Sequence, residues 1–199
     1  EVGPEQGVQT LAFVTTRDSP MKDLRVRRAL NYAVNRDSIA KALLVDRIPA
    51  ATQPVPVAAF GADPTIAQWP YDPVQARKLL AEAGFPQGFA FVAEVRSGLP
   101  AYVTDVYQQV AADLAKIGVR MEIRLIPAAQ YARGLYDGDW KGDAIGIDYS
   151  VAPAMDGLKP FYRHSCLWPH PWYCDHEVDA WIADAASATD LGVRRDLTR

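Results

Sequence analysis

The hydrophobic pattern of residues 89–125 switches from that of a strand to that of a helix and back again. Residues 89–95 are apolar on both faces, as in a central strand of a sheet. Residues 100–117 carry apolar side chains at helical spacing, and residues 119–125 alternate between apolar and charged side chains. If the two strands are parallel, a right-handed crossover is expected. This unit predicts helices packed on a sheet.

Strands and helices alternate through the rest of the chain as well. We expect strands over residues 8–16 and 142–149, and a helix over residues 174–187. On that helix, Trp181 falls on the apolar stripe and is expected to face inward, as is Leu125 on the alternating strand. The order of the elements predicts an α/β or α+β layer structure.

Helix starts can be placed from capping residues. Asp23, Asn35 and Asp72 each stand directly before a helical pattern, where a side-chain oxygen can accept a backbone N–H. Gly84 follows the third of these helices and can take the left-handed conformation that ends it. The intervening residues 45–71 are rich in proline and predict a long ordered loop.

Composition excludes several classes of function. The net charge is −3 and the isoelectric point is near 5.6, which argues against a nucleic-acid-binding protein. The sequence lacks a run of apolar residues long enough to span a membrane, and it lacks nucleotide-binding and nucleophile-elbow motifs. It starts without Met and ends in an uncapped helical pattern, so we expect a piece cut from a larger protein.

Both cysteines and all three histidines gather around the segment CLWPHPWYC: His164, Cys166, His170, Cys174 and His176. Five nitrogen and sulfur ligands could supply the four that zinc needs, although their spacing is not that of common zinc motifs. Alternatively, the cysteines form a disulfide, which would stabilise the protein by about 2–3 kcal/mol for a loop this short. Sequence alone leaves both possibilities open.

Two further features can be functional or structural. Trp168, Trp172 and Tyr173 either pack the loop onto the protein or form the wall of a ligand cleft. Asp148 stands at the carboxyl end of an apolar strand, where open α/β sheets bind ligands. It could cap the following loop or form an ion pair with a cationic ligand group.

Four segments, taken in order, resemble those of a known family. They are DLRVRRALNYAVNRDSIAKALL, PYDPVQARKLLAEAGF, VAADLAKIGVRMEIRLIP and HEVDAWIADAASATDLGVRRDL. The family is the peptide/nickel class of bacterial extracellular solute-binding proteins (family 5), which are the receptors of ABC importers. The resemblance extends over nearly the whole chain.

The resemblance implies a fold and a set of partners. Members of the family have two α/β lobes of the type II periplasmic-binding-protein fold, and we expect residues 1–199 to be one domain. That domain would be most of the second, C-terminal lobe, truncated at both ends, with a mixed sheet flanked by helices. The implied partners are a small-molecule or peptide ligand, the N-terminal lobe and the ABC permease subunits, with no nucleic acid, cofactor or enzymatic activity.

The resemblance also implies roles for residues. Asp148 corresponds to the aspartate that pairs with the α-amino group of a peptide ligand. Tyr149 and Ser150 would line the cleft, with Trp168 and Trp172 as apolar walls. The residues that follow this strand depart from the family pattern, which leaves peptide specificity open.

The resemblance favours a disulfide between Cys166 and Cys174, because the dipeptide-receptor branch has one in a similar loop. A disulfide fits a periplasmic or extracellular location. The alternative function is a metal or metal-chelate binding module that uses the His/Cys cluster of residues 164–176. An isolated lobe is expected to bind ligand weakly or not at all.

Overall fold

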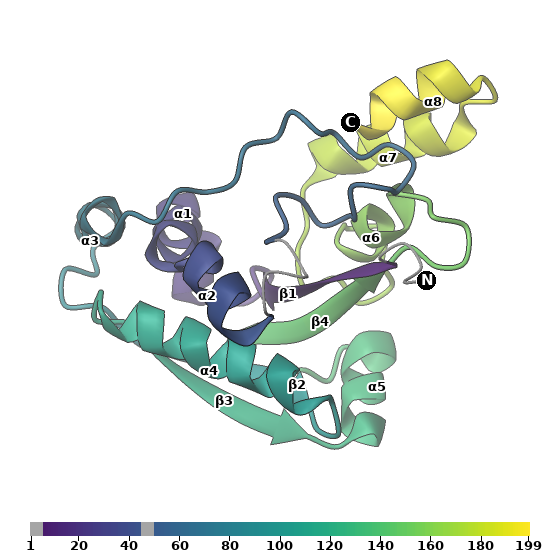
Figure 1. Ribbon diagram of the computed structural model, residues 1–199. Coiled ribbons are helices and arrows are strands. Elements are labelled where there is room, and N and C mark those ends of the chain that lie inside the picture. Colours follow the sequence, from purple (N-terminus) through teal and green to yellow (C-terminus); the bar gives the residue numbers. More distant parts are fainter. Residues whose placement is uncertain (1–5, 45–49) are drawn as a thin grey trace. The chain divides into compact units, whose positions relative to one another are not determined.

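The structure is a computed structural model that describes residues 6–44 and 50–199. In this part of the chain, strands and helices alternate as predicted (Figure 1). The strands are β1 (Gly7–Phe13), β2 (Ala90–Arg96), β3 (Arg120–Ile126) and β4 (Ala144–Ser150), and the helices are η1 (Pro20–Lys22), α1 (Leu24–Ala33), α2 (Arg36–Leu43), α3 (Pro73–Glu82), α4 (Ala101–Ala115), α5 (Ala128–Asp137), α6 (Leu158–Arg163), α7 (His176–Ser187) and α8 (Leu191–Thr198).

The four strands form one sheet in the order β1-β4-β2-β3. Strand β2 pairs in parallel with both β3 and β4, so the predicted strand–helix–strand unit is a parallel crossover through α4. Strand β1 runs antiparallel to β4, because Val151 N donates to Gln6 O while Val14 N donates to Asp143 O, each over 2.8 Å. The sheet is therefore mixed, and the predicted fold class is confirmed.

The helix caps lie where the sequence places them. The side chain of Asp23 accepts from Arg25 N at the start of α1, and that of Asn35 accepts from Ser38 N at the start of α2. Asp72 caps α3 in the same way, and Gly84 after that helix has a φ of 90°, in the left-handed region. Local side-chain chemistry sets these boundaries, which is why they can be predicted without knowledge of the tertiary fold.

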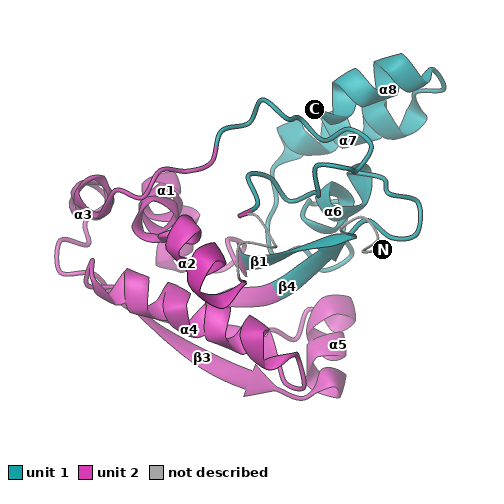
Figure 2. Cartoon of the chain, in the orientation of Figure 1, with its two compact units in different colours: residues 1–11, 51–67, 147–199 teal, residues 12–50, 68–146 magenta. Residues whose placement is uncertain are grey.

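The described residues cluster into two compact units, shown in teal and magenta in Figure 2. Unit 1 draws on residues 1–11, 51–67 and 147–199, and unit 2 draws on residues 12–50 and 68–146. The division between them passes along β1 and β4. That the chain is one lobe of a larger protein stays a prediction.

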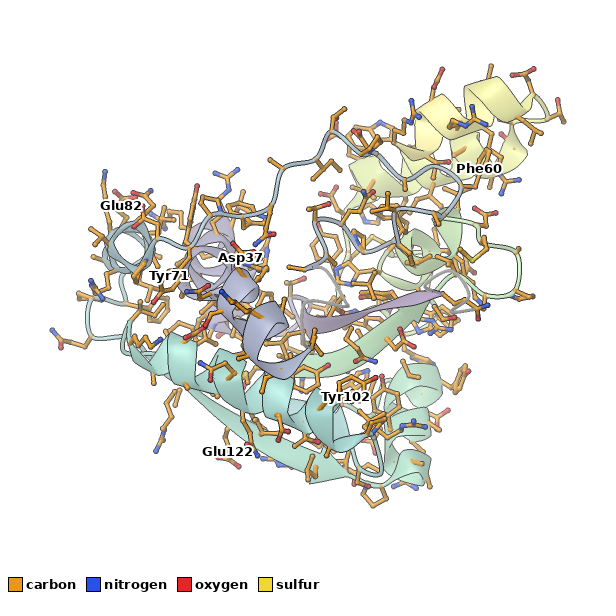
Figure 3. The ribbon with its side chains drawn as sticks, in the orientation of Figure 1. Asp37, Phe60, Tyr71, Glu82, Tyr102 and Glu122 are labelled. Carbon is orange, nitrogen blue, oxygen red and sulfur yellow. A yellow bond between two sulfur atoms is a disulfide. The ribbon has the colours of Figure 1, made fainter. Side chains whose placement is uncertain are left out.

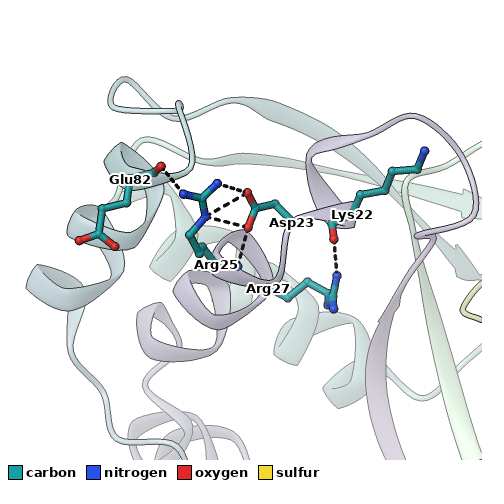
Figure 4. Close-up of polar contacts among 5 residues, drawn as sticks. All are labelled: Lys22, Asp23, Arg25, Arg27 and Glu82. Carbon is teal, nitrogen blue, oxygen red and sulfur yellow. Dashed lines mark hydrogen bonds and ion pairs between the residues drawn. The ribbon is translucent and has the colours of Figure 1, made fainter. Parts of the chain in front are cut away.

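Unit 2 holds the parallel strands and the helices around them. Helix α1 buries Val26, Ala29 and Ala33 completely and packs against α3. An exposed polar connection joins these two helices (Figure 4). Arg25 forms an ion pair with Asp23 at 2.6 Å, and its Nη1 donates to the backbone oxygen of Glu82 over 2.6 Å.

Unit 1 is built around the proline-rich loop and the segment after β4. Buried residues of both segments form a common core, joined by the partly buried side chains of Met155 and Phe161. Phe60, labelled in Figure 3, forms a parallel bridge with Asp156, whose carboxylate pairs with Arg194 at 2.5 Å. The loop is thus ordered over residues 51–67, as predicted, whereas residues 45–49 lie outside the described part.

Two expected core positions are wrong. Trp181 on α7 is 54% exposed, whereas its neighbour Ile182 is buried. Leu125 on β3 is 53% exposed, although Met121 on the same face of the strand is buried. Strand β3 is at the edge of the sheet, and at this end the face that carries Leu125 is left open, while Ile126 on the opposite face is 2% exposed. Glu122, also on β3, is exposed as the alternation predicts (Figure 3).

Candidate functional site

Asp148 lies near the carboxyl end of the inner strand β4, and its side chain is exposed. Its neighbours on the opposite face of the strand, Ile147 and Tyr149, are 1% and 4% exposed. Among the residues that the structure describes, none forms a hydrogen bond or an ion pair with the Asp148 carboxylate. The sheet therefore holds a carboxylate that none of the described residues pairs with.

The surroundings of Asp148 change the pKa of its carboxyl group. Although solvent reaches the side chain, surrounding protein replaces part of its hydration, and this desolvation raises the pKa of Asp148 above its ordinary value. The positive charge of Arg163 acts in the opposite direction and lowers that pKa, with desolvation as the larger effect. A carboxylate that is partly desolvated and has no close partner is stabilised when a cation arrives.

Gly7 on β1 makes room for this carboxylate. A Cβ atom on residue 7 would collide with Oδ1 of Asp148, so any other residue there would force the carboxylate to turn away. Glycine in a strand commonly marks such a close approach. The sequence analysis missed Gly7, because nothing local in the sequence signals which residue the neighbouring strand places beside Asp148.

Arg163 ends helix α6, and its guanidinium carbon lies 5.5 Å from the centre of the Trp168 ring. Trp168 also meets Tyr162 edge to face, with ring centres 6.2 Å apart. Both Arg163 and Trp168 are partly buried. Arg163 is a second residue that the sequence analysis missed, and its position directly before the His/Cys cluster was the available signal.

Of the other two aromatic residues suggested as walls, Trp172 is covered by protein and Tyr173 is partly buried. Trp172 is only 1% exposed, and its indole nitrogen donates to Nδ1 of His164 over 3.0 Å. The hydroxyl of Tyr149 contacts the same nitrogen at 2.5 Å, and Tyr173 stacks on the His164 ring at 4.7 Å. This burial favours Trp168 rather than Trp172 as a wall for a ligand.

The donor chemistry of this cluster fixes the histidine tautomer. An indole N–H can only donate, so Nδ1 of His164 must accept, and the neutral ring carries its proton on Nε2. The hydroxyl of Tyr149 also lies within hydrogen-bond distance of Nδ1. Ser150, the remaining predicted cleft residue, is partly buried, and its Oγ accepts from Ala152 N over 3.2 Å.

The predicted disulfide is confirmed. Cys166 and Cys174 are joined by an S–S bond of 2.00 Å with a Cα–Cα distance of 4.4 Å. The loop is also held to α7, because Cys166 N donates to Oδ1 of Asp179 over 3.1 Å. The disulfide therefore closes a loop that begins after α6 and ends just before α7.

The metal alternative fits this arrangement poorly. Potential ligand atoms of Cys166, Cys174 and His176 lie within 4.8 Å of one another. However, the disulfide consumes both thiols, and it is the thiolate that binds metals. Nδ1 of His164 is already occupied by hydrogen bonds, so the five residues do not offer the ligand set that the sequence suggested.

Residues 1–166 match the family model described as bacterial extracellular solute-binding proteins, family 5 Middle. The chain belongs to this family. It is 30% identical over 200 residues to the glutathione-binding protein GsiB of Shigella dysenteriae serotype 1 (strain Sd197), a match that covers 96% of this chain and 38% of that protein. The family is one of extracellular solute-binding proteins rather than enzymes, which agrees with the expected binding role and with the expected periplasmic or extracellular location.

Solved structures of the same fold cover almost the whole chain. HbpA2 from Haemophilus parasuis superimposes with a TM-score of 0.87 at 24% identity, covering 98% of this chain and 39% of that one. The dipeptide binding protein from Pseudoalteromonas sp. SM9913, in complex with Met-Leu, gives a TM-score of 0.85 at 24% identity with the same coverage. The family 5 chain thus spans less than two fifths of the length of these proteins. Its described helices include none that is long and apolar enough to cross a membrane.

Proposed function

We propose that this chain is most of the second lobe of the solute-binding component of an ABC importer. The intact protein would capture a peptide or another amine-bearing solute between two lobes by hinge closure and deliver it to the permease subunits. Family membership supports the transport role, and the chain covers less than two fifths of each relative, as we expect for one lobe. The other partner in the site is then the N-terminal lobe of the same protein.

The environment of the Asp148 carboxylate is the observation that supports the proposal most directly. This carboxylate is exposed on an inner strand, without a partner among the described residues, in a space that Gly7 keeps open. Desolvation raises its pKa, so a positive charge placed beside it would stabilise the ionised carboxylate. A protonated amine would compensate the negative charge of this carboxylate through a charge-assisted hydrogen bond.

The choice of an amine over a metal follows from the arrangement of donors. A single unpaired carboxylate suits an ammonium group, whereas zinc needs about four ligands. The cluster of residues 164–176 that could have supplied further ligands is closed by the disulfide. The cystine loop then contributes the indole of Trp168 as an apolar surface beside the amine site.

Isothermal titration calorimetry on the intact two-lobed protein tests the proposal. The panel is dialanine, tetraalanine and glutathione, each with its N-acetylated counterpart. We expect at least one free amine to bind and its acetylated form to bind much more weakly. Asp148→Asn should weaken binding of the free amine, while Asp196→Asn, an exposed aspartate of the same unit, should not. Equal binding of free and acetylated forms would contradict the proposal.

A further inference from the structure

Three side chains that can bind a metal meet where the cystine loop joins α7. Cys166, Cys174 and His176 each offer one ligand atom, and these atoms lie within 4.8 Å of one another. Ligand atoms around a tetrahedral zinc ion are separated by roughly 3.5–4 Å, given bonds to zinc of about 2.0–2.3 Å. Side-chain rotations alone can therefore bring the three ligand atoms into the geometry of a zinc site, once the sulfur atoms are free to move apart.

Asp179 holds two of these three residues without the help of the disulfide. Its Oδ1 accepts from Cys166 N over 3.1 Å, and its Oδ2 lies 3.3 Å from Nδ1 of His176. The Asp179 side chain is 12% exposed, so these contacts are partly shielded from water. The third residue, Cys174, stands directly before Asp175, which caps α7. The cluster should therefore persist when the S–S bond is broken.

The carboxylates around the cluster favour a cation. Glu177 and Asp179 lie in the first turn of α7, directly after the capping Asp175. In zinc sites a carboxylate next to a histidine ligand orients the ring and makes it a stronger ligand, and Asp179 has this place beside His176. Two thiolates and a neutral imidazole balance the charge of Zn²⁺, and water can complete the coordination because His176 is exposed.

The disulfide prevents metal binding until a two-electron reduction removes it. While Cys166 and Cys174 are bonded to each other, neither sulfur is a thiolate. Cys174 is exposed, so a dithiol reductant can reach the S–S bond and exchange with it through a mixed disulfide. The dithiol is oxidised to its own disulfide, and the protein gains two electrons and two protons as two thiols. Zinc binding then releases both protons.

We propose that Cys166, Cys174 and His176 form a zinc site when the disulfide is reduced. The cystine loop then has two closed forms, one joined by the S–S bond and one joined by zinc between the same two cysteines. This site differs from the one that the sequence suggested, because His164 is occupied by hydrogen bonds and His170 lies outside the group. The proposal does not depend on which solute the protein transports.

Zinc titration of the intact protein against a chromophoric chelator tests the proposal. Oxidised protein is compared with protein that has been reduced by a dithiol and freed of it under argon. Reduced wild type should bind one more zinc ion per chain than oxidised wild type. His176→Ala and Asp179→Asn should each weaken that binding by about tenfold or more. His170→Ala is the matched control and should leave it unchanged, because His170 is an exposed histidine of the same loop.

Two further measurements separate a metal site from a loss of structure. Reduced protein loaded with Co²⁺ should show thiolate-to-cobalt charge-transfer absorption, which a Cys166→Ser, Cys174→Ser variant should lack. Zinc should also raise the urea midpoint of reduced wild type towards that of oxidised protein. Equal zinc binding by reduced wild type and the double-cysteine variant, or equal losses from His170→Ala and His176→Ala, would overturn the proposal. A reduced protein that unfolds and is not restored by zinc would overturn it as well.

Discussion

Trp172 donates its indole N–H to Nδ1 of His164 over 3.0 Å, and this bond anchors the cystine loop to the end of helix α6. The indole is 1% exposed, so it is a core residue of unit 1. Trp168, four residues earlier in the same loop, is only partly buried and supports Arg163. The two tryptophans therefore have different consequences for stability and for binding.

Trp172→Ala should lower the free energy of unfolding by about 3–5 kcal/mol, the usual range for truncating a buried aromatic side chain. Trp168→Ala should lower it much less and should instead weaken ligand binding by the intact protein. Urea denaturation and calorimetry of both variants measure the two effects. A larger loss of stability from Trp168→Ala than from Trp172→Ala would contradict the assignment.

Loss of the disulfide should destabilise the protein without abolishing its fold. In the chain-entropy model, opening a loop with a separation of 8 residues costs about 2–3 kcal/mol. Urea denaturation of a Cys166→Ser, Cys174→Ser variant beside wild type measures this difference. Intact mass before and after reduction should show a gain of two hydrogen atoms. Free thiols together with stoichiometric zinc would instead support the metal-binding alternative.

Gly7→Ala should weaken peptide binding while preserving the fold. The new methyl group would displace the carboxylate of Asp148, whereas alanine is otherwise tolerated in a strand better than glycine. If Gly7 acts through Asp148, the loss should disappear when Asp148→Asn is already present, which a double-mutant cycle detects. Additive losses would show that Gly7 affects binding in another way.

Asp23 should make stability depend on pH in the acid range. The hydrogen bond from Arg25 is the main cause that lowers the pKa of Asp23 in the folded protein. Because the folded pKa lies below the unfolded value of about 3.9, the stabilisation is complete above that value and is lost as pH falls through the folded pKa. Asp23→Asn keeps an oxygen for the cap but does not titrate.

Unfolding midpoints measured between pH 2 and pH 6 distinguish the two proteins, a window of about two pH units on each side of that unfolded pKa. Below about pH 4, wild type should lose stability more steeply than Asp23→Asn. Parallel curves for the two proteins would show that the pair seen in Figure 4 contributes nothing to folding.

Local chemistry made much of the fold predictable. The caps at Asp23, Asn35 and Asp72 depend on neighbours two or three residues away. The strand–helix–strand unit follows from hydrophobic periodicity, but that its strands are parallel is known only from the structure. Periodicity identifies the apolar face of a helix or strand, but it does not show how much of that face other elements bury. For this reason Trp181 and Leu125 were wrongly predicted to be buried.

The site was predictable only in part. The position of Asp148 at the end of a strand and the pairing of the cysteines came from the pattern and from the family resemblance. Gly7 acquires its role only because β1 and β4 lie side by side, and Arg163 only because α6 brings it over Trp168. The contact of Gly7 with Asp148 joins segments far apart in the sequence, which no local pattern encodes, whereas Arg163 and Trp168 are five residues apart and depend on how α6 leads into the cystine loop.

The central claim is that Asp148 binds a ligand amine, and its pKa in the intact protein tests this most directly. The carboxyl carbon chemical shift of Asp148, followed against pH, should give a pKa above the ordinary aspartate value in the free protein. With saturating peptide, the ammonium group should lower that pKa, because an adjacent positive charge favours the ionised carboxylate. A pKa that is unchanged when peptide is bound would contradict the claim.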